Sequence, residues 1–251
     1  MAQRPSTLQF EQAFLATWPA RETKYDGGWL WRFADGYTKR ANSAQSLDPE
    51  DGYDVMLRLE KFGAWARARD LSPVFKVTPL ANERIISALN AAHWQSFDQS
   101  AVMAMPLGAV FTPKHACLVL QPGDPIWYEA QAQLSQYDGE TLNALNAILG
   151  RISAPVAGFV VLDEAGVPAA SALASNSGGI SVYLNVVVRD DLRGTGYGRS
   201  IMQAALNWSR KRKASWAAVQ VVSDNISAIN LYRSLGFRDI YRYHYRRPQI
   251  Q

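Results

Sequence analysis

The chain has 251 residues and a formal net charge of +4, with 48% hydrophobic and 19% charged residues. This composition can bury a substantial core, and the length suits one large domain or two small ones. No apolar run reaches the roughly 18 residues of a membrane span, and residues 1–6 lack a hydrophobic signal core, so we expect a cytoplasmic location and no membrane partner. The single cysteine, Cys117, excludes an intrachain disulfide, and three scattered histidines predict no metal site.

The first half of the chain alternates short helices and strands. Residues 8–20 have the apolar spacing of a helix, and residues 28–33 and 36–41 predict a hairpin around Ala34-Asp35-Gly36. An amphipathic helix, a strand, a second helix and a second strand are then expected at residues 53–69, 73–79, 81–92 and 100–105.

The second half contains a glycine-rich junction between a predicted strand and a predicted helix. Residues 180–188 are rich in β-branched side chains, and apolar residues recur at helical spacing after Arg193-Gly-Thr-Gly-Tyr-Gly198. Glycines leave the backbone amides of such a loop uncovered, and a helix N-terminus adds a positive dipole end. The junction therefore predicts a ligand that carries a phosphate or pyrophosphate.

Two familiar phosphate motifs do not fit this loop. A Walker loop needs a lysine where the chain has Gly198-Arg199-Ser200. A dinucleotide fingerprint needs glycine at position 199 and an acidic residue near position 216, which lies in an apolar predicted strand. An ordinary strand-to-helix turn is the remaining alternative on this motif alone.

A second motif follows the predicted strand at residues 216–222. Asn225-x-x-Ala228-x-x-Leu231-Tyr232-x-x-Leu235-Gly236-Phe237 predicts a short helix closed by Gly236. With both motifs, residues 150–247 resemble the GNAT superfamily of N-acetyltransferases. Arg193–Gly198 matches its acetyl-CoA loop and Asn225–Phe237 its second signature. The resemblance implies an α/β (α+β) GNAT fold: a mixed, mostly antiparallel sheet with splayed central parallel strands and flanking helices.

The resemblance also implies a reaction and a set of site residues. Acetyl-CoA is the expected co-substrate, and its acetyl group is expected to pass directly, in a ternary complex, to a primary amine of a small molecule or peptide. Tyr232 is expected near the sulfur as a catalytic acid, with a packing tyrosine as the alternative. A non-catalytic acyl-CoA-binding regulatory module is the alternative function. The residues expected to bind the cofactor are Val186, Val188, Arg193, Gly194, Thr195, Gly196, Tyr197, Gly198, Arg199 and Asn225.

The sequence assigns no general base. Residues 175–188 contain no Asp, Glu or His, although Tyr183 or Asn185 could orient a water molecule that relays the proton. His244 is the only histidine in the matched region, and a lone histidine in an aromatic strand is more often structural.

Positive charge gathers toward the C-terminus. From Arg189 onward the sequence has 12 lysines and arginines and 4 acidic residues, which favours a phosphorylated cofactor. The run Arg210-Lys-Arg-Lys213 could indicate nucleic acid, but cations also suit the end of a helix, where they could face a 3′-phosphate. We therefore expect no nucleic-acid partner.

The first half predicts a second, degenerate GNAT-like domain. The expected division is residues 1–108 and 109–251. Residues 40–49 contain no glycine loop, and residues 89–94 lack the tyrosine and Leu-Gly-Phe of the second signature. Residues 29–32 and 38–43 resemble stretches of two-domain GNAT proteins; an unrelated α/β cap domain is the alternative.

Acceptor recognition is the least determined feature. It is expected in the first half and at residues 124–151, and a monomer or a homodimer is expected. Side chains of the first half that could reach the acceptor, if they are not core, are Trp29, Trp31, Arg32, Arg40 and Asn42.

Overall fold

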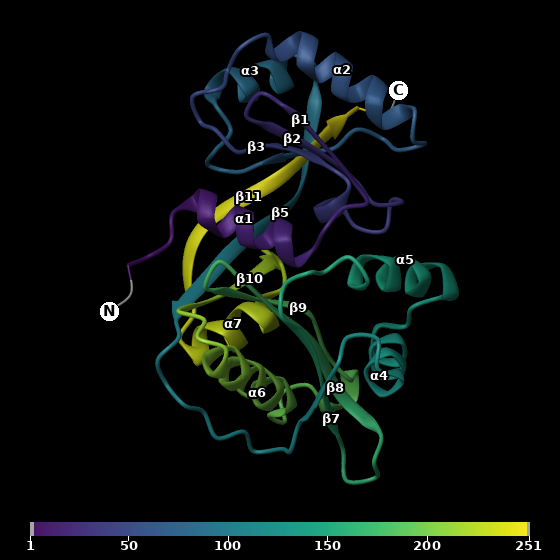
Figure 1. The fold of residues 1–251 in the computed structure, drawn as a ribbon, viewed down its shortest axis with the longest axis vertical. Coiled ribbons are helices and arrows are strands. Elements are labelled where there is room, and N and C mark those ends of the chain that lie inside the picture. The colour runs from purple at the N-terminus through teal and green to yellow at the C-terminus, as the bar shows by residue number, and fades with distance from the viewer. Residues whose placement is uncertain (1–2, 250–251) are drawn as a thin grey trace.

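The computed structural model describes residues 3–249, in which eleven strands and seven α-helices form (Figure 1). The strands are β1 (Glu22–Asp26), β2 (Trp29–Phe33), β3 (Ala44–Ser46), β4 (Phe75–Val77), β5 (Trp94–Pro106), β6 (Leu118–Leu120), β7 (Val156–Leu162), β8 (Pro168–Ser177), β9 (Ile180–Val188), β10 (Trp216–Val222) and β11 (Arg238–Pro248). The helices are α1 (Thr7–Thr17), α2 (Val55–Arg67), α3 (Glu83–Ala91), α4 (Pro125–Ser135), α5 (Gly139–Leu149), α6 (Tyr197–Lys211) and α7 (Ile226–Leu235).

All eleven strands belong to one sheet, in the order β1-β2-β3-β4-β11-β5-β10-β9-β8-β7-β6. Neighbouring strands are antiparallel except for two parallel pairs, β3 with β4 and β9 with β10. The predicted mixed, mostly antiparallel sheet with central parallel strands is therefore confirmed. None of the helices within residues 3–249 is long and apolar enough to cross a membrane.

The same succession of elements occurs twice. Three strands, a helix, a strand, a helix and a final strand follow one another from β1 to β5 and again from β7 to β11. In each half the third and fourth strands form the parallel pair, and the sheet order on one side of β11 and β5 mirrors that on the other. The fold is thus a tandem arrangement of two similar halves.

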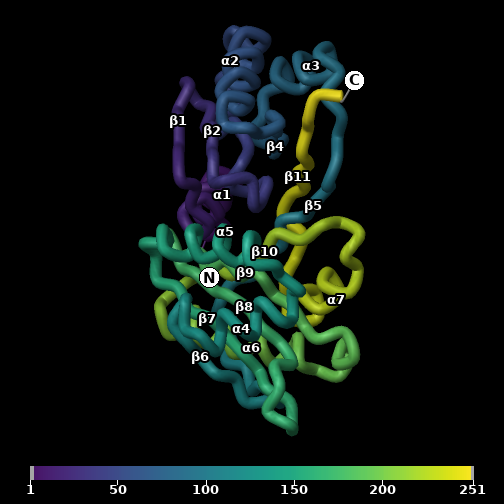
Figure 2. Tube along the Cα trace, turned by 90° about the vertical axis from the view of Figure 1, so that its right-hand side faces the viewer, coloured from purple at the N-terminus to yellow at the C-terminus, as the bar shows by residue number. Residues whose placement is uncertain are grey.

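Strand exchange joins the two halves. The last strand of the first half, β5, pairs with β10 and β11, and β11 pairs at its other edge with β4. Both views show β11 rising beside β5 from the second half into the first (Figures 1 and 2). The first helix, α1, packs against β8 and β9 of the second half. The division at residues 108 and 109 falls in the connector after β5 and stays a prediction.

Three hydrophobic clusters cover this sheet. One lies beneath α6 and α7, a second joins α1, α4 and α5 to the sheet, and a third fills the first half with side chains of α2 and α3. Trp29 and Trp31 are 0% and 1% exposed and belong to the third cluster. These two tryptophans are core residues and do not reach a substrate.

The hairpin predicted around residues 34–36 is wrong. β2 pairs instead with the polar strand β1 across a turn at residues 27–28, and residues 39–41 form a 3-10 helix. The side chain of Asn42 explains the difference, because its Oδ1 accepts hydrogen bonds from the amides of Ala34 and Gly36 at 2.7 and 3.1 Å. Side-chain bonding of this kind holds a turn and replaces ladder bonds.

A buried ion pair lies where the halves meet. Glu11 of α1 is 0% exposed, and its carboxylate lies 2.5 Å from Nζ of Lys76 in β4. It also accepts hydrogen bonds from Gln45 Nε2 at 3.1 Å and from the Tyr241 hydroxyl at 2.7 Å. Four elements from both ends of the chain therefore meet on one carboxylate.

We expect Glu11→Ala to lower the free energy of unfolding by about 3 to 5 kcal/mol, because Lys76 would remain as an uncompensated buried charge. Urea denaturation measures this loss. Replacing both partners, Glu11→Leu with Lys76→Met, should restore most of the stability, since no lone charge remains. A loss below about 1 kcal/mol for the single variant would contradict a structural role for the pair.

Candidate active site

The two central parallel strands, β9 and β10, separate part of the way along their length. Trp216 to Val219 pair with Ile180 to Tyr183, and beyond Tyr183 the described residues of β9 and β10 do not pair with each other. At that point the register of β9 against β8 shifts, and Asn185 has a left-handed φ of 51°. A bulge of this kind bends the strand away from its neighbour. The structure therefore confirms the predicted splay and its place between these strands.

The edge of β9 that faces the opening carries free backbone amides. Arg189 donates its amide hydrogen to Ala169 O of β8 at 2.9 Å. Successive strand residues point their amides to opposite edges, so the amides of Val186 and Val188 face the opening. An extended ligand could pair with this edge as an additional strand.

The glycine loop follows β9 and forms the N-terminus of α6. Gly194 and Gly196 have φ values of 80° and 104°, a region that side chains other than glycine rarely adopt. Among residues 3–249, the amides of Gly194, Gly196 and Gly198 have no hydrogen-bond acceptor. A Cβ added at Gly194 would meet no atom within 4 Å, so the space over this amide is open. Gly198 instead allows close packing, because its Cβ would lie 3.2 Å from Leu231.

The second signature forms α7, as expected. Asn225 caps this helix by accepting a hydrogen bond from the amide of Ala228 at 3.0 Å, and Gly236 closes it with a φ of 106°. Tyr232 is 6% exposed and its ring packs against Phe237. Burial raises the pKa of the Tyr232 phenol to about 12, and the charge of Arg40 acts in the opposite direction. The phenol is thus protonated at neutral pH.

The loop, the open edge of β9 and α7 enclose a groove of about 420 Å³. Thr195 and Tyr197 do not line it with their side chains. The Thr195 hydroxyl donates to Leu192 O at 2.6 Å, and the Tyr197 ring stacks on His115 at 4.0 Å between centroids. The remaining residues named from the sequence do line it: Val186, Val188, Arg193, Gly194, Gly196, Gly198, Arg199, Asn225 and Tyr232.

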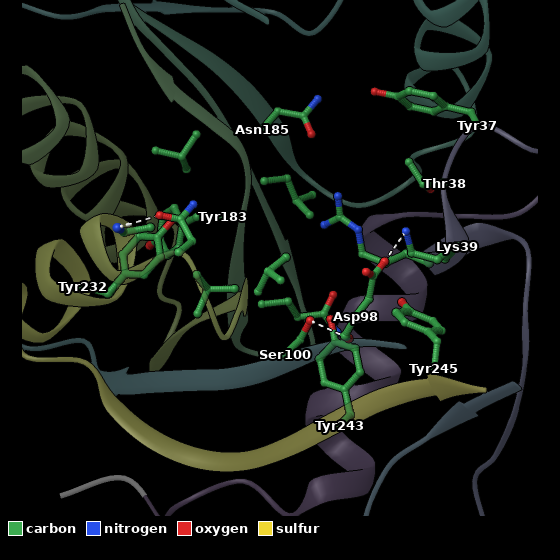
Figure 3. Close-up of a pocket in the computed structure, with 18 of the residues that line it drawn as sticks. Tyr37, Thr38, Lys39, Asp98, Ser100, Tyr183, Asn185, Tyr232, Tyr243 and Tyr245 are labelled. Atoms are coloured by element: carbon green, nitrogen blue, oxygen red, sulfur yellow. Dashed lines mark hydrogen bonds and ion pairs between the residues drawn. The ribbon is translucent and has the colours of Figure 1, made fainter. Parts of the chain in front are cut away.

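A second cavity, of about 510 Å³, lies between the two halves (Figure 3). Its walls come from residues 36–40, β5, β9, β10, α7 and β11. Figure 3 shows Tyr232 on one side and Lys39 on the other. Four residues line both this junction cavity and the groove, so the two spaces meet at the splay: Val186, Asn225, Ala228 and Tyr232.

The junction cavity contains functional groups that the sequence did not single out. Asp98 of β5 is the one carboxylate that lines it among the described residues, and it lies 2.5 Å from Lys39 Nζ. Asp98 has a left-handed φ of 47°. No local sequence pattern marks such a residue. β5 and residues 36–40 belong to the first half, and they reach the splay of β9 and β10 only because β5 pairs with β10 and β11.

Other residues considered from the sequence lie elsewhere. The Tyr183 hydroxyl donates to Ser209 Oγ at 2.8 Å within the core, so it does not point into the cavity. His244 pairs with Val77 in the ladder between β11 and β4, and its Nε2 accepts from Arg246. Among the described residues, no side chain from residues 124–151 lines the groove or the junction cavity. The expectation that this segment contacts the acceptor is therefore not supported by either cavity.

The run Arg210–Lys213 lies at the far end of α6 from the glycine loop. This helix has 15 residues, so its two ends are about 22 Å apart at 1.5 Å per residue. Arg212 stacks on Trp208 at 4.1 Å. The groove is instead lined by Arg193 and Arg199, which corrects the idea that the run at the helix end faces a phosphate there.

Splayed parallel strands, a glycine loop at the next helix and a capped signature helix together define an acetyltransferase of the GNAT type. The chain belongs to this superfamily, since residues 7–246 match the family described as "Probable histone acetyltransferase Rv0428c C-terminal". It is 27% identical to the "Uncharacterized N-acetyltransferase YobR" of Bacillus subtilis (strain 168) over 250 residues, covering 95% of this chain and 97% of that protein.

Two solved structures resemble the whole chain. A GCN5-related N-acetyltransferase from Kribbella flavida has a TM-score of 0.75 and 15% identity, covering 99% of this chain and 98% of that one. A tandem GNAT protein from the clavulanic acid biosynthesis pathway has a TM-score of 0.68 and 14% identity, covering 100% and 90%. The predicted GNAT fold and its tandem form are confirmed.

Proposed function

We propose that this acetyltransferase moves the acetyl group of acetyl-CoA to a primary amine bound between the two halves. The observation that carries the proposal is the meeting of two cavities at the splay, where Tyr232 lines both. A donor in the groove and an acceptor in the junction cavity would touch at this one place. Direct transfer in a ternary complex requires such contact.

The groove fits a CoA thioester. The unpaired amides of Gly194, Gly196 and Gly198 suit a pyrophosphate, and Arg193 and Arg199 add positive charge. The free edge of β9 suits the amides of a pantetheine chain. Only one such groove is proposed, because the loop after β3 in the first half is acidic (Leu47-Asp-Pro-Glu-Asp-Gly-Tyr-Asp54) and would repel phosphates.

When bound, acetyl-CoA supplies an activated thioester carbonyl. The amine nitrogen attacks this carbonyl carbon, the carbon–sulfur bond breaks, and the amine gives up one proton. Tyr232 would hydrogen-bond to the departing sulfur and transfer its phenolic proton to the thiolate, so that CoA leaves as a thiol. The phenolate would then regain a proton from solvent, while the proton lost by the amine passes to a base. The amide product and free CoA then leave.

Asp98 is the residue we propose as acceptor of the amine's proton, directly or through water. Its carboxylate lines the junction cavity together with Tyr232. A base in this position comes from the first half of the chain, which gives that half a role in the reaction of the second.

We expect Asp98→Asn to lower kcat by about 100-fold or more while the affinity for acetyl-CoA stays the same. Steady-state thiol-release kinetics over a panel of primary amines, with calorimetry of acetyl-CoA, measure both quantities. Lys39→Gln is the matched control, since it breaks the same ion pair and keeps the carboxylate. An equal loss in both variants would indicate that the pair only holds the cavity wall.

A further inference from the structure

On the basis of the acetyl transfer proposed above, we propose that the acceptor is an amine that also carries an anionic group, a carboxylate or a phosphate, and that Arg40 binds this group. The junction cavity and the small space behind it contain four cationic side chains and two carboxylates. Lys39, Arg40 and Asp98 line the junction cavity, whereas Arg32, Lys76 and Glu11 line the small space, to which Arg40 also belongs.

Two of the four cations are already paired. Lys39 lies 2.5 Å from Asp98, and Lys76 lies 2.5 Å from Glu11. Arg32 and Arg40 have no carboxylate partner within residues 3–249. The two spaces together therefore have an excess of two positive charges, and the junction cavity itself has an excess of one, from Arg40. An anionic ligand in the junction cavity would compensate this charge.

Arg32 acts as a fixed support for this site. It is 5% exposed and donates to the carbonyl oxygens of Trp18 and Arg40, with a longer contact to Leu15 O at 3.5 Å. Burial lowers its pKa to about 10, so it is still charged at neutral pH. It thus fastens the backbone at Arg40 to the end of α1, and its charge adds to the field in the cavity.

Arg40 itself has an unused guanidinium. The residue is half-buried, lines the junction cavity, and places its guanidinium 5.1 Å from the centroid of the Trp18 ring. Its side chain has no hydrogen-bond acceptor among the described residues. A planar guanidinium held on an aromatic ring presents a fork that matches the two oxygens of a carboxylate or phosphate.

Two further donors in the same cavity also have no partner. The side-chain nitrogens Asn185 Nδ2 and Gln220 Nε2 are buried without an acceptor in the described part of the chain. Buried N–H groups are rarely left unpaired, because the lost hydrogen bond is costly. Asn185 and Gln220 lie at the splay, on β9 and β10. An acceptor whose anionic group is bound by Arg40 could therefore also accept hydrogen bonds from these two side-chain amides.

The test uses matched acceptors that differ only in the anion. We would compare amino acids with their carboxamides, and O-phosphoethanolamine with ethanolamine, by thiol release from acetyl-CoA. At least one anionic member should exceed its neutral partner by about 10-fold or more in kcat/KM. The pair that shows the difference identifies carboxylate or phosphate as the group recognised.

Variants assign that preference to Arg40. Arg40→Gln should raise KM for the preferred anion by about 10- to 100-fold and remove its advantage over the neutral partner, with Arg40→Lys intermediate. Arg84→Gln, which removes an exposed positive charge on α3 away from both cavities, should change nothing. Calorimetric titration of the same anion into protein saturated with CoA gives a second readout without turnover, and Arg40→Gln should abolish this binding.

The outcomes separate this inference from the function on which it rests. Failure of acetyl-CoA to bind would overturn both. Three results would overturn the inference alone while acetyl-CoA still binds and turns over. They are a preference for the neutral amines, the failure of every anionic probe to bind the CoA-loaded protein, and an anion preference that survives Arg40→Gln.

Discussion

Replacing Gly196 with aspartate should abolish detectable binding of acetyl-CoA, a loss of about 100-fold or more in affinity. Gly196 has a φ of 104°, which an aspartate adopts only with strain, and the new carboxylate would stand at the amides proposed to hold the pyrophosphate. Steric exclusion by the protein is not the cause, because a Cβ there meets only His115, at 3.9 Å. Calorimetric titration with acetyl-CoA measures the effect.

Gly166→Asp is the matched control for this variant. Gly166 also has a positive φ, of 78°, and a Cβ there meets nothing within 4 Å, but it lies in the turn between β7 and β8. The same strain and charge should therefore leave acetyl-CoA affinity unchanged. Equal loss of binding in both variants would mean that Gly196→Asp acts through stability, and intact binding in Gly196→Asp would contradict the loop assignment.

Tyr232→Phe should lower kcat by about 100-fold or more, with the dissociation constant of acetyl-CoA within about twofold of the wild type. The phenol is proposed to act on the departing sulfur, so its loss affects the chemical step more than binding. Single-turnover kinetics and calorimetry measure the two effects. Tyr128→Phe removes a hydroxyl at a half-buried position that lines neither cavity, and it should leave both quantities unchanged.

The pH dependence gives a further check on Tyr232. Burial raises the pKa of its phenol to about 12, so the acid is fully protonated through the neutral and mildly alkaline range. The wild-type rate should therefore show no loss from this group below about pH 10. A decline of the wild-type rate that begins well below pH 10, and that is absent in Tyr232→Phe, would contradict a buried phenol. Retained turnover in the variant would favour the packing role of this tyrosine.

The parts of the fold with strong local patterns were predictable from the sequence. The strands at residues 180–188 and 216–222 have the predicted bounds, since β-branched runs there end at turn residues. β1 was missed because Glu22-Thr-Lys-Tyr-Asp26 is a polar edge strand without apolar alternation. Strand exchange between β5 and β11 could not be predicted, because pairing between residues more than a hundred positions apart leaves no local pattern.

The residues of the site likewise divide into those that the sequence predicted and those that it did not. The glycine loop and Tyr232 belong to contiguous motifs and were named from the sequence. Asp98 and the role of Arg40 depend on how the first half is placed against the splay, which the exchanged strands determine. Gln220 lies within the valine-rich strand β10, and nothing in the sequence around it indicates a site residue. It lines the cavity because the pairing of β10 with β9 ends at Val219, just before it.

Calorimetric titration of the full-length protein with acetyl-CoA tests the central claim most directly. We expect one CoA site in each chain, in the groove between the glycine loop and α7, and therefore a stoichiometry of one. Two sites per chain would mean that the acidic loop of the first half binds CoA as well. No binding would mean that the groove does not hold a CoA thioester, and the proposed acetyl transfer would be contradicted.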